Sequence, residues 1–106
     1  MNEKQASLFF EALASDVRLK IFRLLVRFSP NGLVQGEIAQ KLDLPITNLS
    51  FHLKALVHST LVTVQREGHF MRYKANTKLM REVVGYLTSE CCTGCQVADS
   101  NTLNQS

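Results

Sequence analysis

The fold is decided by the stretch Pro45-Ile-Thr-Asn-Leu-Ser-Phe-His-Leu-Lys-Ala-Leu-Val57. Its apolar residues recur at the spacing that places side chains on one face of an α-helix, and they are Ile46, Leu49, Leu53, Leu56 and Val57. The side chains off this stripe are mostly short hydroxyl and amide groups, which suit base edges and phosphates in a major groove. These are Thr47, Asn48, Ser50, Phe51 and Lys54. The stretch therefore predicts a helix with a core face and a reading face.

A second short helix is predicted just before this stretch. From Gln35 to Leu42 apolar residues again recur at helical spacing, and Asp43-Leu44 leaves room only for a tight turn. Pro45 favours a helix start, because its fixed backbone angle fits the first helical position and biases the preceding residue away from helix. Two helices joined this closely are typical of a helix-turn-helix, whose second helix enters the major groove.

Two amphipathic helices are predicted ahead of this pair. The first runs from about residue 3 to residue 13, and the second from Asp16 to about Phe28 with Ser15 as its N-cap. The apolar side chains that the second helix directs toward the core are predicted to be Val17, Ile21, Leu24, Leu25 and Phe28. The turn cluster Ser29-Pro-Asn-Gly32 then separates this helix from the helix-turn-helix.

A two-stranded hairpin is predicted after the helix-turn-helix. Residues 61–66 and 69–75 alternate between apolar and polar side chains, and Glu67-Gly68 between them is a tight turn. The basic side chains that can project toward solvent or a phosphate backbone are Arg66, His69, Arg72 and Lys74. A basic wing beside a major-groove helix is a coherent arrangement for DNA binding.

A last helix, from Lys78 to about Glu90, is predicted to join two copies of the chain. Asn76-Thr77 provides its N-cap, and a broad apolar stripe follows. In a chain this small, such a stripe is typical of a core or dimer face, here with the first helix beside it. We expect a mainly α fold with a β-hairpin wing, a winged helix-turn-helix that is homodimeric through its terminal helices. This DNA-binding and dimerisation domain would span residues 1–90, and residues 91–106 would form a cysteine cluster and a mobile C-terminal tail.

The positive charge of the chain is unevenly distributed. The formal net charge is +3, whereas between residues 44 and 81 six lysines and arginines accompany one glutamate. This excess of positive charge is typical of a protein that binds a polyanion, although a solvated basic face without a partner has the same pattern. No apolar run reaches the roughly 20 residues of a membrane span, and the N-terminus lacks the features of a secretion signal. A cytoplasmic protein with no membrane partner is expected.

In this arrangement the chain resembles the small winged-helix repressors of the ArsR family, which sense metals and metalloids. Residues 14–25, Ala-Ser-Asp-Val-Arg-Leu-Lys-Ile-Phe-Arg-Leu-Leu, are similar to the family's opening motif ADxxRLxILxLL. Residues 49–56, Leu-Ser-Phe-His-Leu-Lys-Ala-Leu, are similar to its VSxHLxxL motif, and residues 64–73 look like its wing. The likeness runs from about residue 8 to residue 87.

The resemblance implies a homodimer that binds an inverted repeat in double-stranded operator DNA and blocks transcription until an inducer arrives. It also implies that Arg66 and Arg72 of the wing contact DNA. The segment that it places in the major groove contains Thr47, Asn48, Ser50, Phe51 and His52. A second interpretation of His52 stays open, because between Leu49 and Leu53 it can be a hydrogen-bonded residue at the edge of the core.

The chain departs from the two ligand sets that are common in this family. Many of its arsenic sensors carry a cysteine pair in the helix before the recognition helix, and residues 35–42 contain no cysteine. The other common site uses His with Asp or Glu on the last helix, where residues 77–89 contain no His and only Glu82. The inducer site is therefore expected just beyond this helix, at Cys91, Cys92 and Cys95.

These three cysteines indicate metal binding or reactive thiols, because a reducing cytosol does not favour a disulfide scaffold. In a continued helix they would face one way, and Gly94 would let the backbone bend to gather the three sulfurs. Soft sulfur ligands with no interleaved His or carboxylate favour thiophilic ions. Trivalent arsenic or antimony, supplied as arsenite or antimonite, fits best, and cadmium, lead or mercury also fits. No organic cofactor is expected.

Other functions stay open on the sequence alone. Cys92-Thr-Gly-Cys95 is a Cys-x-x-Cys that could close as a disulfide, so the repressor could sense thiol oxidation with the same cysteines. The chain could also be a winged-helix DNA-binding or protein-interaction module without an inducer, in which the cysteines are incidental. An enzyme is not expected, because Ser, His and Asp are scattered and the βαβ context of an oxidoreductase is missing.

Overall fold

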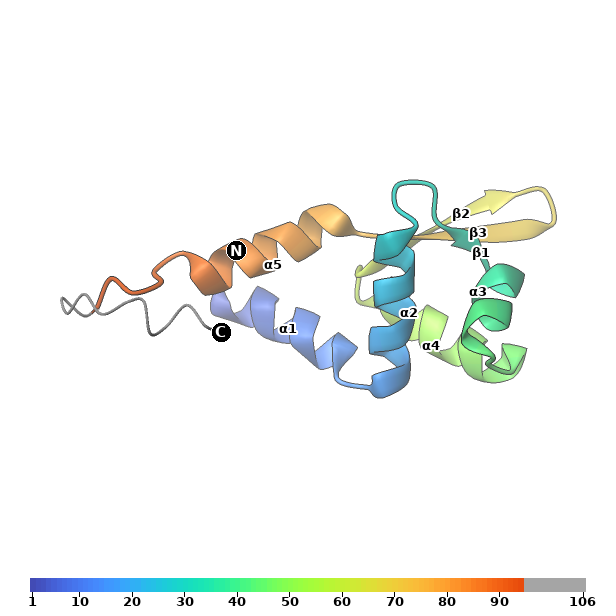
Figure 1. Ribbon diagram of the computed structural model, residues 1–106, viewed down its shortest axis with the longest axis horizontal. Coiled ribbons are helices and arrows are strands. Elements are labelled where there is room, and N and C mark those ends of the chain that lie inside the picture. The colour runs from blue at the N-terminus through green and yellow to red at the C-terminus, as the bar shows by residue number, and fades with distance from the viewer. Residues whose placement is uncertain (95–106) are drawn as a thin grey trace.

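The computed structural model describes residues 1–94, which form five helices and a small antiparallel sheet whose hairpin projects at one end of the molecule (Figure 1). In chain order the elements are α1 Glu3–Leu13, α2 Asp16–Arg27, β1 Leu33–Val34, α3 Gln35–Leu42, α4 Ile46–His58, β2 Val62–Glu67, β3 Phe70–Ala75 and α5 Thr77–Thr88. All the predicted helices and both predicted strands are present. The predicted bounds of α1 and α3 are confirmed, whereas α5 ends two residues before Glu90.

Two of the predicted helix caps are confirmed by side-chain hydrogen bonds. The Ser15 hydroxyl accepts from the backbone N–H of Arg18 at 3.4 Å, and the Asn76 side-chain oxygen accepts from that of Leu79 at 3.1 Å. Each bond satisfies one of the backbone donors that the first turn of a helix leaves unpaired. The starts of α2 and α5 are therefore fixed by local sequence.

The core lies where α2, α3 and α4 meet the base of the sheet and α5. The largest fully buried side chains are Ile21, Leu25, Ile38, Leu49, Leu53, Leu56, Leu61, Val62 and Val83. Burying a side chain of this size stabilises a fold by about 1.5–3 kcal/mol relative to leaving it exposed. The apolar stripe of α4 supplies three members of this set, so this helix is packed along most of its length.

Two residues predicted for the core are exposed instead. Ile46 is 50% exposed because it is the first residue of α4, Pro45 being the N-cap rather than the first helical residue. Phe28 is the C-cap of α2 and is 36% exposed, with the Lys41 ammonium 5.1 Å and the Arg27 guanidinium 5.8 Å from its ring centre. A cation over an aromatic face stabilises a ring that the core does not cover.

The turn between α3 and α4 is tight, as predicted. Asp43 adopts the left-handed conformation with φ 54° and ends α3, and Leu44 donates its backbone N–H to the carbonyl of Ala39 at 3.0 Å. Aspartate is among the few residues that enter this conformation readily. The chain can therefore reverse within a few residues and start α4 at Ile46.

The sheet has the strand order β1-β3-β2, with every pair antiparallel. Strands β2 and β3 form the predicted hairpin, and their register pairs Val62 with Ala75 and Glu67 with Phe70. Strand β1 was not predicted, because two residues cannot show an alternating pattern. It pairs Leu33 with Tyr73 and so joins the hairpin to the helical body.

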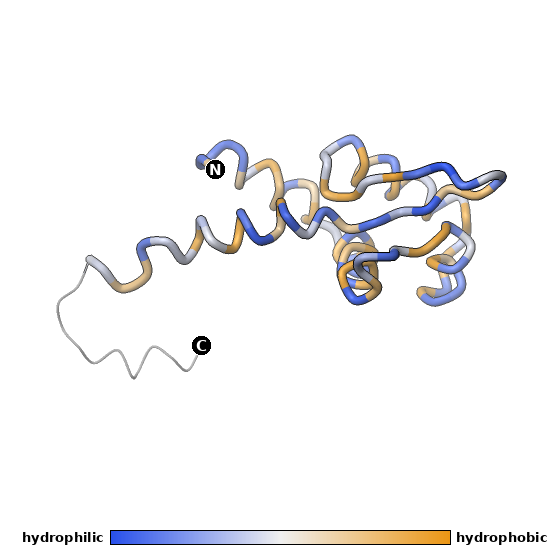
Figure 2. Tube along the Cα trace, turned by 90° about the horizontal axis from the view of Figure 1, so that it is seen from above, coloured by the Kyte–Doolittle hydropathy of each residue, from blue (hydrophilic) through white to orange (hydrophobic). Residues whose placement is uncertain are grey.

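The terminal helices α1 and α5 lie at one end of the molecule, opposite the tip of the hairpin (Figure 1). Polar and apolar positions alternate along the whole described chain (Figure 2), and several large apolar side chains of these two helices are solvent-exposed. They are Leu8, Phe10, Val84 and Leu87. Within the described part, no helix combines the length and the apolar character needed to cross a membrane.

Gly32 provides a test of the packing between the hairpin and the helical body. Its φ is +73°, and a Cβ added there would lie 2.2 Å from the Tyr73 carbonyl oxygen. We expect Gly32→Ala to lower the free energy of unfolding by at least about 1–3 kcal/mol, the cost of a strained backbone position. Urea denaturation followed by circular dichroism measures the change.

The matched control is Gly36→Ala in α3, where an added Cβ meets nothing within 4 Å. It should leave stability unchanged or raise it by up to about 1 kcal/mol, the helix-propensity difference. Equal stability of the two variants would contradict the close approach of Gly32 to β3.

Candidate nucleic-acid interface

The outer face of α4 exposes polar side chains together with one aromatic ring. Burial of Leu49, Leu53 and Leu56 fixes which side of the helix faces the core. The predicted reading residues on the opposite side that are exposed are Thr47, Asn48, Phe51 and Lys54. Phe51 is 66% exposed, an uncommon position for a side chain of its size. This surface has the width of one helix, which a major groove admits.

The remaining predicted reading residues, Ser50 and His52, are half-buried and bonded to neighbouring helices. Gln35 at the start of α3 donates its side-chain amide to the Ser50 hydroxyl at 2.6 Å. Arg18 of α2 donates its Nε–H to His52 Nδ1 at 3.2 Å. The two bonds fix the rotation of α4 about its axis. For His52, the hydrogen-bonded position at the edge of the core is confirmed.

The environment of His52 keeps its imidazole neutral. Burial lowers the pKa of His52 below its usual value, and the nearby Arg18 charge lowers it further. Only the neutral ring has a nitrogen that can accept the Arg18 hydrogen bond. The His52 ring also packs edge-on against Phe51, with 5.4 Å between ring centres, and Arg18 lies 6.0 Å from the Phe51 ring centre. Arg18 and His52 therefore support the exposed aromatic ring.

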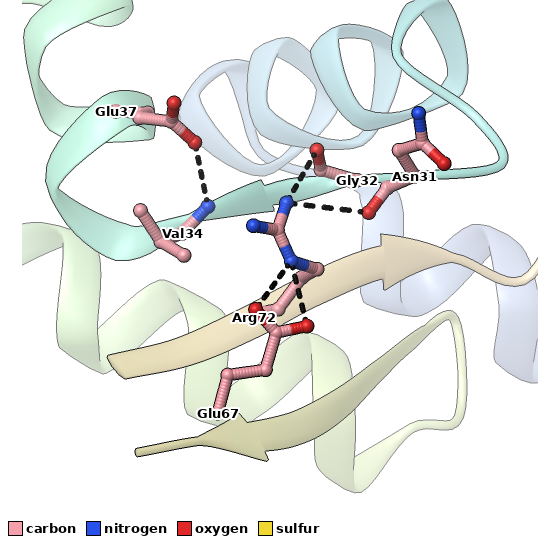
Figure 3. A network of polar contacts seen from close by, with 6 residues as sticks. All are labelled: Asn31, Gly32, Val34, Glu37, Glu67 and Arg72. Carbon is pink, nitrogen blue, oxygen red and sulfur yellow. Dashed lines mark hydrogen bonds and ion pairs between the residues drawn. The ribbon is translucent and has the colours of Figure 1, made fainter. Parts of the chain in front are cut away.

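The wing places its two predicted arginines in different settings. Arg66 is exposed on β2, opposite Met71 of β3. Arg72 is half-buried, and its guanidinium contacts the Glu67 carboxylate and two backbone carbonyls of the loop before β1 (Figure 3). DNA contact by these residues stays a prediction, and only Arg66 presents its side chain on an exposed position.

Cys91 and Cys92 follow α5 in a turn rather than in a continued helix, because α5 ends at Thr88. Cys91 and Cys92 are both exposed and their sulfur atoms lie 3.2 Å apart. A hydrogen bond with Cys91 raises the pKa of the Cys92 thiol, and the charge of Cys91 and burial act in the same direction. Cys95 lies outside the described residues. Within residues 1–94, no three His, Cys, Asp or Glu side chains are grouped closely enough to hold a metal ion.

An open groove of about 1100 Å³ runs between the terminal helices and the end of α4. Its walls include Leu8 and Phe9 of α1 and Leu79, Glu82 and Tyr86 of α5. The groove adjoins the exposed apolar residues of both helices. The predicted dimer face is thus incompletely filled in a single chain, and the groove mixes apolar side chains such as Leu8 with polar ones such as Glu11 and Glu82.

The residues that hold the interface in place were not predicted from the sequence. They are Arg18, which bonds His52, Gln35, which bonds Ser50, and Glu67, which bonds Arg72 across the hairpin turn. Arg18 and His52 are 34 positions apart in the chain. No periodicity or spacing in a single sequence signals such a pair.

The family model for a helix-turn-helix domain matches residues 13–65, which is half of the chain. The chain belongs to this helix-turn-helix family. The matched residues include α2, α3 and α4, the three helices that carry the hydrogen bonds around Ser50 and His52.

Known relatives of this helix-turn-helix chain are transcriptional regulators. The transcriptional repressor SdpR of Bacillus subtilis is 26% identical over 78 residues, 74% of this chain and 83% of SdpR. HlyU from Vibrio cholerae is 27% identical with a TM-score of 0.67, covering 87% of this chain and 99% of HlyU. A homodimeric winged helix-turn-helix DNA-binding domain from Mycobacterium bovis, described as a possible ArsR-family regulator, is 26% identical. Its TM-score is 0.66, over 89% of this chain and 87% of that domain.

The chain is thus a helix-turn-helix protein, and the proteins it is similar to include a transcriptional repressor, HlyU and a possible ArsR-family regulator. The resemblance read from residues 14–25 and 49–56 is confirmed to this extent. Its arsenic-responsive character stays a prediction.

The Arg18–His52 contact predicts a pH dependence of stability. Because the pKa of His52 is lowered in the folded chain, the unfolded chain binds the proton at higher pH. The contribution of this group to stability is therefore complete above about pH 6.5, the ordinary histidine pKa, and is lost as the pH falls below it. We expect His52→Gln to show a smaller loss of unfolding free energy than the native chain between about pH 7.5 and pH 5.5.

Urea titrations at a series of pH values measure this difference. His58→Gln, at an exposed histidine of the same helix, is the matched control and should keep the native dependence. Parallel pH profiles for the native chain and His52→Gln would refute the assignment.

Proposed function

We propose that the chain is a metalloid-responsive repressor. It binds operator DNA as a homodimer and is released when As(III) or Sb(III) binds Cys91, Cys92 and Cys95. The observation that carries the DNA-binding part is the exposed outer face of α4, whose rotation is fixed by Arg18 and Gln35. A helix held in a fixed rotation suits direct readout of base edges, because less ordering is left to be done on binding.

Charge and shape both favour duplex DNA as the ligand of this face. Lys54 lies among the exposed residues of α4, and Arg66 lies on the exposed wing. Phosphate contacts by such side chains supply most of the non-specific affinity for a duplex. The apolar Phe51 ring suits contact with a thymine methyl group, which the major groove displays.

Homodimerisation is proposed through α1 and α5. Their exposed apolar residues Leu8, Phe10, Val84 and Leu87 form a surface that a second copy could bury. The similar domain from Mycobacterium bovis is homodimeric. Two recognition helices related by a twofold axis would then read half-sites about 34 Å apart in an inverted repeat.

The inducer proposal depends on the thiols beyond α5. The sulfur atoms of Cys91 and Cys92 are exposed and 3.2 Å apart, so one ion can contact both. Cys95 follows three positions after Cys92 and supplies the third sulfur. Three soft sulfurs without a fourth ligand suit a three-coordinate trivalent metalloid better than tetrahedral zinc.

Thiol oxidation is the second candidate function, and the close approach of the Cys91 and Cys92 sulfurs favours it. One of the similar structures is a reduced form of HlyU from Vibrio cholerae, 28% identical with a TM-score of 0.67. The raised pKa of Cys92 lowers its thiolate fraction, which weakens both oxidation and metal binding and so does not separate the two functions. We place metalloid binding first because three closely spaced cysteines match a three-coordinate ion.

DNA binding is tested by fluorescence-anisotropy titration of a duplex from the chain's own promoter at several salt concentrations. Lys54→Gln should weaken binding and make the slope of log K against log salt shallower by about one, because one phosphate contact is lost. Lys4→Gln, at an exposed lysine of α1 outside the helix-turn-helix, is the matched control and should leave the slope unchanged. Absence of salt-dependent binding by the native chain would reject the proposal and favour a protein-interaction module.

Inducer release is tested by adding arsenite, antimonite, cadmium, zinc or peroxide to the preformed complex. Cys95→Ser should bind DNA like the native chain and lose release by arsenite, since two sulfurs hold the ion more weakly than three. Ser89→Ala, at an exposed residue of the same segment, should respond normally. Release of the Cys95→Ser complex by arsenite would contradict the three-sulfur site, and release by peroxide alone would favour the oxidation sensor.

A further inference from the structure

The Arg72 side chain connects the wing to the loop that follows α2 (Figure 3). Its Nε–H lies 3.0 Å and 2.9 Å from the two carboxylate oxygens of Glu67, at the end of β2. Its Nη1 donates to the carbonyl oxygen of Gly32 at 3.3 Å and reaches that of Asn31 at 3.5 Å. One guanidinium thus contacts the tip of the hairpin and the helical body at once.

The register of the sheet explains why these groups meet. Glu67 is paired with Phe70, and Phe70 and Arg72 are two residues apart on β3, so all three share one face. Glu67 and Arg72 are therefore diagonal neighbours, within reach of long side chains. On the other side of β3, Arg72 is paired with Val34, directly after the loop whose carbonyls it contacts.

The base of the wing also packs against α2, α3 and α4, with Val62 buried and Tyr73 and Ala75 against the core. Strand β1 contributes only two residues to the sheet. The backbone N–H of Val34 donates to the Glu37 carboxylate at 3.0 Å, which ties the start of α3 to the same strand (Figure 3). Helix α3 in turn bonds α4 through Gln35 and Ser50. The Arg72 bridge is therefore part of a series of contacts that fixes the orientation of the wing relative to the recognition helix.

We infer that Arg72 is a positioning residue, which holds the wing at a fixed angle to α4 by bridging Glu67 to the Asn31 and Gly32 carbonyls. The inference rests on the proposed DNA binding. It gives Arg72 a structural role in place of the direct contact with DNA that was expected from the sequence. Phosphate contact in the wing is then left to exposed side chains such as Arg66. Glu67, although acidic, supports DNA binding because it orients the arginine.

The chemistry of arginine separates this role from phosphate contact. A guanidinium presents several N–H groups in a fixed plane and can serve Glu67 and the loop carbonyls together, whereas an ammonium is a single point charge. Lysine is nevertheless an effective phosphate ligand. Arg72→Lys therefore removes the bridge and keeps the charge, and Arg23→Lys, at an exposed arginine of α2, is the matched control.

The test measures promoter-duplex affinity over a salt series for the native chain, Arg72→Lys, Arg72→Gln and Arg23→Lys. We expect Arg72→Lys to bind about three- to tenfold more weakly, as for the loss of one or two hydrogen bonds, with Arg23→Lys close to native. The salt slope of Arg72→Gln should stay within about half a unit of the native slope. Native-like binding by Arg72→Lys, or a slope reduced by about one in Arg72→Gln, would overturn the inference in favour of direct phosphate contact.

Hydrogen exchange of the free protein supplies a readout that does not depend on DNA. Arg72→Lys and Glu67→Gln should each speed exchange of the β1–β3 and β2–β3 amides about threefold or more, while α2 amides keep native rates. Unchanged wing exchange in both variants would overturn the inference. If the native chain binds no duplex, the proposed function fails, and exchange alone still decides whether Arg72 holds the wing.

Discussion

The interface depends on how α4 is held against the rest of the helix-turn-helix. Leu49, Leu53 and Leu56 are buried almost completely, and this burial supplies most of the energy that binds the helix to the body. Apolar contact alone leaves some freedom of rotation, because it is non-directional. The hydrogen bonds to Ser50 and His52 remove that freedom from two different helices.

The parts of the fold that follow local rules could be predicted from the sequence. Helical spacing, two capping residues and the alternating strands each depend on residues within a few positions of one another. The bounds of α1 and α3 were therefore predicted well, and the hairpin to within one residue, since its turn is Gly68-His69 and not Glu67-Gly68. The predictions for Ile46 and Phe28 were wrong because burial at a helix end depends on what packs there, which periodicity does not encode.

The candidate site was predicted only as a set of positions. The sequence placed Thr47, Asn48, Phe51 and Lys54 on the outer face of a helix, and the structure exposes all four. It could not separate them from Ser50 and His52, whose partners Gln35 and Arg18 come from distant helices. It also treated Arg66 and Arg72 alike, because only the register of the sheet brings Glu67 beside Arg72. Long-range partners thus decide which polar residues are free to meet a ligand.

The contact of Arg18 with His52 has a mechanical consequence for the whole regulator. It lies between α2 and α4, and only the short Ala14-Ser15 segment separates α2 from α1. A tilt of α1 would therefore move α2, and α4 would rotate with it. In a dimer, the distance between the two α4 helices would then change while the exposed face of each α4 kept its shape.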